Sequence, residues 1–268
     1  MQNNYTVFVS SSDNYSDIWD VFFDMFYHFW PDFQGKIVLN TQEKTYHHKH
    51  LKIICTQVGK RKYFGETFLA GLEKVKTNNV LLMMIDYMFM GGVNVKTLDK
   101  LYNFFISENL DSLCLFPQSF INSRTTSNPQ VNIALPPGGK ILFGFQIAFW
   151  KRQVLNEMVL PHENPWMAEW FGCERAAKMK IRLGFLREKE FMPIPYDARG
   201  CLHQGKWLAN AITQLKGMDY NVDFSRRGKY EDTQEYTTIR FRIKLKYWIW
   251  STGLKGSYWD LLWRKPIH

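Results

Sequence analysis

The chain has 268 residues, of which 46% are hydrophobic and 22% are charged. This composition excludes a wholly disordered protein, and the length allows one large domain or one domain with an appendage. The formal net charge of +9 favours an anionic partner, such as nucleic acid, an acidic membrane surface or a phosphorylated ligand.

The cysteines and the N-terminus indicate a cytoplasmic protein. Cys55, Cys114, Cys173 and Cys201 are far apart and form no CxxC pair, so they predict neither a zinc site nor a disulfide framework. The first residues show no signal peptide, and no apolar run approaches the roughly 20 residues that cross a bilayer.

Apolar periodicity predicts strands and helices that alternate along the first half of the chain. Strands are predicted within 5–13, 36–40, 50–56, 79–86 and 112–117, and helices over 16–30, 65–77 and 95–108. Ser16 is the expected N-cap of the first helix, and Pro31 follows its end. This alternation predicts an α/β fold with a mostly parallel central sheet flanked by helices.

The second half is less regular. Polar residues, Pro and Gly over 121–140 predict a long loop, as in lids and binding loops. A strand or turn leading into a helix is expected over 143–160, and a turn into another helix over 163–181. The charged stretch 225–236 marks a boundary between a domain over 1–224 and a C-terminal segment over 225–268.

Two polar strand ends suggest a binding site, because open α/β sheets bind ligands beyond the carboxyl ends of their strands. Ser10, Ser11, Ser12 and Asp13 follow the first strand, and Asp86 follows the very apolar fourth strand. A buried carboxylate costs several kcal/mol unless it is paired, hydrogen-bonded or metal-bound. Asp86 therefore either has a structural partner, such as a lysine or a helix end, or carries a function.

Four segments in order resemble one known family: "TVFVSSSDNYSDIWDVFF", "YFGETFLAGLEKVKTNNVLLMMIDYMFM", "FQIAFWKRQVLNEMV" and "NPWMAEWFGCERA". Together they look like bacterial glycosyltransferases with the GT-A (Rossmann-like) fold, found in capsule and lipopolysaccharide gene clusters. The resemblance covers roughly residues 5 to 210 and implies a transferase that uses a nucleotide sugar.

The resemblance also implies a divalent metal, Mn²⁺ or Mg²⁺, held against the donor diphosphate by a short acidic motif. Asp86 takes that place here, and His203 is a second candidate ligand. The sequence departs from the pattern at Ile85, where related members usually have a second acid. One carboxylate with phosphate oxygens and water can still hold such an ion.

Further roles follow from the same resemblance. Glu169 in "PWMAEW" would be the general base of an inverting transfer, in a pocket that Trp166 and Trp170 could make partly apolar; Glu163 is its rival. The implied nucleotide-sugar-binding residues are Ser10, Ser11, Ser12, Asp13, Asp86, Gln146 and Lys206. Each residue also has a structural interpretation, as a cap, a turn or a surface group.

Two further clusters have competing interpretations. His47, His48 and His50 suggest a metal, but a solvated loop is the expected structure. Residues 237–250 alternate apolar and basic side chains and end in "YWIW", a pattern that suits either an anionic membrane surface or a strand packed on the core.

The leading interpretation is thus an inverting glycosyltransferase that adds a sugar to a lipid-linked glycan in surface polysaccharide synthesis. It would be cytoplasmic or peripheral on the inner face of the membrane. The alternatives are a nucleic-acid-binding protein, suggested by the charge, and a non-catalytic GT-A-like scaffold, suggested by the missing second acid. No nucleic-acid-binding signature is present, so no nucleic acid partner is expected.

Overall fold

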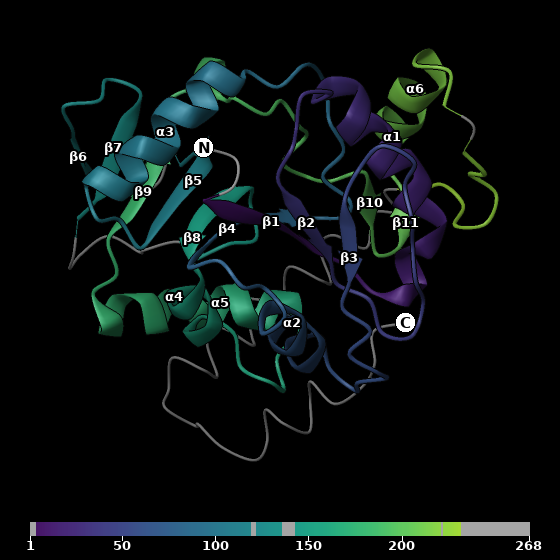
Figure 1. Cartoon of the computed structure of the whole chain (residues 1–268), viewed down its shortest axis with the longest axis horizontal. Coiled ribbons are helices and arrows are strands. Elements are labelled where there is room, and N and C mark those ends of the chain that lie inside the picture. The colour runs from purple at the N-terminus through teal and green to yellow at the C-terminus, as the bar shows by residue number, and fades with distance from the viewer. Residues whose placement is uncertain (1–3, 119–121, 136–142, 221, 232–268) are drawn as a thin grey trace. The chain divides into compact units, whose positions relative to one another are not determined.

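The computed structural model describes residues 4–118, 122–135, 143–220 and 222–231, and a mixed β-sheet lies at its centre (Figure 1). Within these ranges the sheet has nine strands in the order β3-β2-β1-β4-β8-β5-β9-β7-β6. The strands are β1 (Tyr5–Ser10), β2 (Lys36–Leu39), β3 (Ile53–Cys55), β4 (Asn79–Met84), β5 (Ser112–Pro117), β6 (Ser123–Thr125), β7 (Val131–Ala134), β8 (Ala148–Lys151) and β9 (Leu183–Leu186).

The first four strands form a parallel core, as predicted. β1 lies between β2 and β4 and runs parallel to both, with Val7 opposite Ile37 on one side and Leu81 on the other. β2 is also parallel to β3. The side chains of Val80, Leu81 and Leu82 are fully buried, as expected of a parallel strand that is covered on both faces.

The second half of the sheet is mixed. β8 pairs antiparallel with both β4 and β5, and β5 pairs parallel with β9. The prediction of a strand followed by a helix over 143–160 is confirmed by β8 and helix α4 (Arg152–Glu157).

The prediction of a loop over 121–140 is wrong in part, because β6 and β7 form an antiparallel hairpin there. Its polar residues build the turn: the Thr126 hydroxyl donates to the carbonyls of Asn128 and Val131, and the Asn128 side chain accepts from the Gln130 N–H. The hairpin joins the sheet through β7 and β9. Residues 119–121 and 136–142 lie outside the described ranges.

Helices cover both faces of the sheet (Figure 1). The helices of this body are α1 (Trp19–Phe29), α2 (Phe64–Leu72), α3 (Val95–Ser107), α4 and α5 (Pro165–Met179). α3 packs on one face, where the ring of Tyr102 contacts those of Tyr5 and Phe149. On the opposite face Phe68 of α2 packs edge-on against Phe8 of β1. No helix among the described residues is both long and apolar enough for a membrane crossing.

Local signals explain where α1 and α5 begin. The Asn164 side chain caps α5 by accepting the Met167 N–H at 2.9 Å, and Pro165 occupies the first turn. The expected cap of α1 is wrong: Ser16 lies inside a 3-10 helix, Asp13–Ile18, that leads into α1, whose N-cap residue is Ile18.

The histidine cluster is not wholly the solvated loop that was expected. His48 is 6% exposed, and its Nε2 lies 3.2 Å from Asp24 Oδ1 on α1. The ring of His50 stacks on Tyr27 of the same helix, with 4.3 Å between ring centroids. These contacts fasten the connection between β2 and β3 onto α1.

The chain divides into two compact units, each of which is described by itself. The first contains residues 1–201 and 220–222, and the second contains 202–219 and the residues from 223 onward. In the second unit, β10 (Leu202–His203) and β11 (Lys206–Trp207) form a hairpin, followed by α6 (Ala209–Gly217). The C-terminal segment predicted over 225–268 lies mostly outside the described residues and stays a prediction.

Candidate functional site

The carboxyl ends of β1 and β4 lie side by side, so their polar residues meet at one edge of the sheet. Ser10 pairs in register with Met84, and the N–H of Ile85 donates to the Ser10 carbonyl at 3.1 Å. A turn follows at once, in which the Tyr87 N–H donates to the Met84 carbonyl. This geometry brings Asp86 to the edge where an open α/β sheet binds its ligands.

Asp86 is a half-buried carboxylate held in an unusual setting. Its carbonyl accepts the N–H of Cys201, and a Cβ on Gly200 would come within 2.6 Å of its Oδ2. Gly200 has a φ of +75°, a conformation in which glycine is favoured. Burial raises the pKa of Asp86 to about 6, and no ion pair offsets it within the described residues.

The residues near Asp86 fit a metal only in part. Across the described ranges, no group of three or more His, Cys, Asp or Glu side chains is arranged to hold an ion. Ile85 is 3% exposed, so its side chain belongs to the core at the position where an acid was expected. The single carboxylate of Asp86 suits an Mg²⁺ or Mn²⁺ ion that takes most of its ligands from a diphosphate and water. It does not suit an ion held by protein alone.

A hydrogen-bonded cluster surrounds Tyr87, the residue after Asp86. Gln146 Nε2 donates to the Tyr87 hydroxyl at 3.1 Å and to the Ala198 carbonyl, and the Tyr196 hydroxyl donates to Gln146 Oε1 at 2.8 Å. Gln146 was predicted to bind the nucleotide sugar; in this structure its amide is engaged by protein groups. Its contact with a ligand stays a prediction.

Glu169 approaches the same tyrosine from helix α5. Its Oε1 accepts the Phe145 N–H at 3.1 Å. Burial raises the pKa of Glu169, although this hydrogen bond lowers it. Burial, followed by the charges of Asp86 and Glu169, raises the pKa of Tyr87, which indicates that both carboxylates lie close to it. Phe145 is next to Gln146, whose amide donates to Tyr87, so both acids with raised pKa values lie in the neighbourhood of one phenol.

Glu163, the rival of Glu169, has a structural environment. It is 1% exposed and forms a bidentate ion pair with Arg175, at 2.8 Å from Nη1 to Oε1 and 2.7 Å from Nη2 to Oε2. It also accepts the Leu160 N–H. Both of its carboxylate oxygens thus accept hydrogen bonds inside the protein, three in all, whereas Glu169 accepts one backbone bond.

The aromatic surroundings of Glu169 differ from those expected. Trp166, one helical turn before it, is 53% exposed, and the burial of Glu169 involves Phe145 and the backbone of Gly144 instead. Trp170 is half-buried. An exposed indole beside the acid offers a stacking surface for a ligand.

The serines and Asp13 after β1 are partly engaged. The Ser11 hydroxyl accepts from Trp19 Nε1 at 2.8 Å, and Ser10 is 2% exposed. The Asp13 carboxylate accepts the backbone N–H groups of residues 42–44 at 2.8 to 3.0 Å. These bonds outweigh partial burial and lower the pKa of Asp13. The predicted nucleotide contact of Ser10, Ser11, Ser12 and Asp13 stays a prediction.

His203 and Lys206 belong to the second unit, so their predicted contact with the donor is untested. His203 packs edge-on against Tyr230, with 4.5 Å between ring centroids, and Lys206 is exposed. The hairpin is extended by hydrogen bonds between Trp207 and the chain at 228–230.

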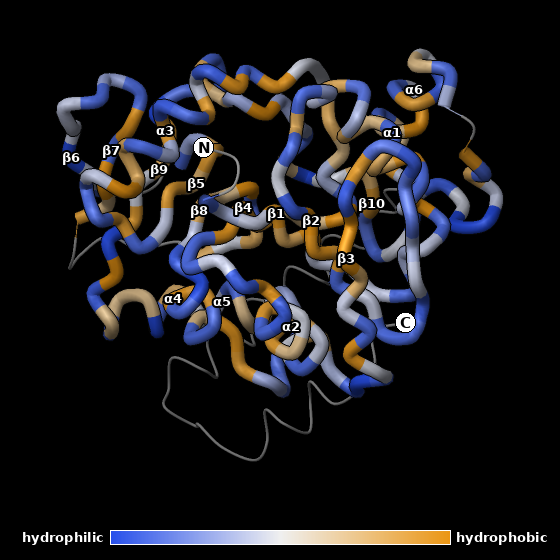
Figure 2. Tube along the Cα trace, viewed as in Figure 1, coloured by the Kyte–Doolittle hydropathy of each residue, from blue (hydrophilic) through white to orange (hydrophobic). Residues whose placement is uncertain are grey.

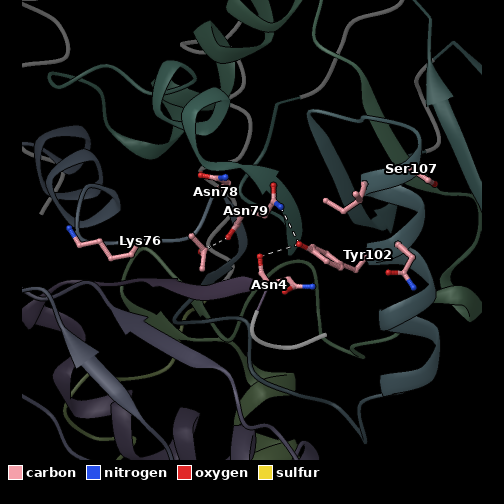
Figure 3. A pocket seen from close by; sticks show the side chains of 9 residues that line it. Asn4, Lys76, Asn78, Asn79, Tyr102 and Ser107 are labelled. Atoms are coloured by element: carbon pink, nitrogen blue, oxygen red, sulfur yellow. Dashed lines mark hydrogen bonds between the residues drawn. The ribbon is translucent and has the colours of Figure 1, made fainter.

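A hollow of about 530 Å³ lies at the opposite edge of the sheet, near the amino ends of β1 and β4 (Figure 3). Its inner polar groups bond to one another: Asn79 Nδ2 donates to the Tyr102 hydroxyl, which donates to the Asn4 carbonyl. The hollow is wide open and contains no acid, so the paired carboxylates at the other edge are the stronger candidate for chemistry.

The sequence did not point to Tyr87, Tyr196 or Gly200. Tyr87 had a local signal, since it follows Asp86 directly. Tyr196 and Gly200 come from a distant segment without periodicity, and only the fold brings them to the site.

No protein-family model matches the chain, and no curated protein matches it. Among solved structures, S. aureus TarS residues 1–349 in complex with UDP-GlcNAc is similar at a TM-score of 0.51 and 12% identity, over 84% of this chain and 69% of that one. The same fragment without a named ligand matches with a TM-score of 0.48 and 14% identity, over 72% of this chain and 59% of that one. The mannosyltransferase PcManGT from Pyrobaculum calidifontis, in complex with GDP-Man and Mn²⁺, has a TM-score of 0.44 and 14% identity. The match covers 67% of this chain and 53% of that one.

At these identities the likeness concerns the fold alone, and the chain spans about three fifths of the first TarS structure. The TarS complex matches most of this chain. The protein therefore has an α/β fold with a parallel-cored mixed sheet that resembles GT-A folds.

Proposed function

We propose that this chain is a nucleotide-sugar-dependent glycosyltransferase that transfers a sugar, with inversion, to a hydroxyl group of a glycan acceptor. The observation that carries the proposal is the pair of acids with raised pKa values near Tyr87: Asp86 at the carboxyl edge of a GT-A-like sheet, and Glu169 bonded to Phe145 beside Gln146. Such perturbed pairs are typical of functional sites.

Glu169 is the general base. An acid whose pKa is raised by burial keeps more basicity near neutral pH than a solvated one, which suits the removal of a proton from a hydroxyl group. The Phe145 N–H fixes one of its oxygens, and in this proposal the other takes the proton of the acceptor hydroxyl. The exposed ring of Trp166 gives the sugar of the acceptor an apolar surface.

Asp86 serves the donor diphosphate. It would hold the divalent ion, which when bound neutralises charge that develops on the leaving group. Gly200 keeps the Asp86 carboxylate in place, because any larger residue would press on Oδ2. Ser10, Ser11, Ser12, Asp13 and Gln146 complete the proposed donor site in the first unit, and the contacts of His203 and Lys206 with the donor stay predictions.

The finer features of the proposal come from the resemblance in the sequence. They are an acceptor linked to lipid, a role in capsule or lipopolysaccharide synthesis, and a cytoplasmic location with membrane contact through residues 225–268. The basic and Trp-rich composition of that segment supports them.

Release of the free nucleotide from UDP-, GDP-, CMP- and dTDP-linked sugars, with and without Mn²⁺, tests the function; the product is a nucleoside diphosphate, or CMP for the CMP-linked sugars. UDP-GlcNAc is the first donor to try, because the TarS neighbour was solved with it. We expect release from at least one donor, a fall of at least 100-fold in Glu169→Gln, and no change in the exposed control Glu157→Gln. A folded protein that turns over none of them would contradict the proposal and favour a non-catalytic scaffold.

A further inference from the structure

One edge of the sheet carries an unbroken series of positive charges. β3 is the outermost strand at this end of the sheet within the described residues. Residues 44–62, which contain β3 and its flanking loops, include no Asp or Glu. Their exposed basic side chains are Lys44, Lys49, Lys52, Lys60, Arg61 and Lys62. These six residues and Ile54 are called the β3-edge surface below.

Ile54 gives this surface an apolar centre. Its side chain is 50% exposed, and it points to the same side of β3 as Lys52, because side chains alternate along a strand. Ile53 and Cys55 point to the other side and are half-buried. In Figure 2 the hydrophobic trace of β3 is flanked by hydrophilic loops.

The nearby acids do not cancel the charge. Glu43 Oε2 lies 3.4 Å from Lys60 Nζ and offsets one of the six charges. The Glu66 carboxylate accepts the backbone N–H groups of Lys62 and Tyr63. Asp24 is beside His48. Asp13, whose pKa is lowered in part by Lys44, is a further nearby acid. The surface therefore keeps a net positive charge that is smaller than its six basic residues alone would give.

We propose that the β3-edge surface binds an anionic lipid bilayer, with the basic side chains on the headgroups and Ile54 in the interface. Lysine and arginine near an anionic membrane each contribute on the order of 1 kcal/mol to binding. An exposed isoleucine gains from insertion into the acyl boundary, but it has no favourable place against the phosphates of a nucleic acid.

The nearest aromatic rings also disfavour a nucleic acid, because they are already covered. The Lys62 ammonium lies 5.0 Å from the centroid of the Tyr63 ring, and Tyr46 stacks on Phe23 at 5.2 Å. Single-stranded nucleic acids are usually bound on free aromatic faces. The lipid proposal concerns the sheet domain and holds whether or not the chain is a glycosyltransferase.

Sedimentation of the full chain with vesicles tests this proposal. The vesicles contain either phosphatidylcholine alone or phosphatidylcholine with 30% phosphatidylglycerol. The test variant combines Lys49→Gln, Lys52→Gln and Lys62→Gln. The control combines Lys96→Gln, Lys100→Gln and Lys178→Gln, three exposed lysines on α3 and α5 that remove the same charge. Equal melting temperatures of the two variants would exclude unfolding.

We expect the wild-type protein to bind the anionic vesicles only, and to be released by 0.5 M salt. The test variant should bind them roughly 100-fold more weakly, and the control less than 10-fold more weakly. Ile54→Ser should weaken binding a few-fold without changing its dependence on salt. An equal loss in both triple variants, or no loss in the test variant, would overturn the proposal. So would tighter binding to single-stranded RNA than to the vesicles.

Discussion

Glu163 lies just before helix α5 and Glu169 lies within it, and a matched pair of substitutions separates a structural acid from a functional one. In Glu163→Gln, the Arg175 guanidinium loses its bidentate carboxylate in a site where Glu163 is 1% exposed. Removal of one partner of a buried pair costs about 3–5 kcal/mol. Because glutamine keeps part of the hydrogen bonding, we expect about 3 kcal/mol, which lowers Tm by roughly 6–12 °C in a chain of this size.

Glu169→Gln should behave in the opposite way. It removes a carboxylate whose ionised form is disfavoured by burial and that receives one backbone hydrogen bond. We expect Tm to change by less than about 2 °C at pH 7.5, and donor turnover to fall roughly 10² to 10⁴-fold. Differential scanning fluorimetry and nucleoside diphosphate release measure the two effects. A stable Glu163→Gln protein without activity, or a fully active Glu169→Gln protein, would refute this reasoning.

Three further outcomes follow from the site. The raised pKa of Glu169 should move the acidic limb of kcat/KM above the usual range of glutamate, with activity lost as the pH falls through that pKa; a limb near pH 4 would contradict this. Since burial raises the pKa of Asp86 to about 6, its contribution to folding stability is greatest below pH 4 and is lost as the pH rises through 6. In metal-free buffer Asp86→Asn should therefore be more stable than wild type at pH 7.5, by at most about 3 kcal/mol, and equal to it at pH 4. Gly200→Ala should lower the free energy of unfolding in urea by about 1–3 kcal/mol and abolish most of the donor turnover, because Gly200 has a φ of +75° and its added Cβ would lie 2.6 Å from Asp86. The control Gly92→Ala should change neither quantity, because a Cβ there meets nothing within 4 Å.

The parallel core could be predicted from the sequence because its signal is local. A strand buried on both faces must be apolar at every position, and the run from Val80 to Ile85 satisfies this requirement. The β6–β7 hairpin could not be predicted, since β6 has three polar, mostly exposed residues and β7 has only four residues, too few for a clear pattern. Its pairing with β9 depends on contacts between distant segments, which no local pattern encodes.

The same distinction applies to the site. Asp86 was found because the end of a predicted central strand is a known place for ligands. Glu163 and Glu169 could not be ranked from the sequence, because only the helical fold brings Arg175 onto Glu163. The tyrosine cluster and Gly200 depend on the chain from 196 to 201, which returns to Asp86 without a sequence signal.

Thermal-shift screening against UDP, GDP, CMP and dTDP and their common sugars, with and without Mn²⁺, tests the central claim most directly. A ligand that binds only the folded chain raises its melting temperature. At a ligand concentration of 100 times Kd, the free energy of unfolding rises by about 2.7 kcal/mol. The account predicts a shift with the sugars of one nucleotide that is lost in Asp86→Ala. If no nucleotide or nucleotide sugar shifts the melting temperature of the folded wild-type chain, the claim of a donor site at the carboxyl edge of the sheet is contradicted.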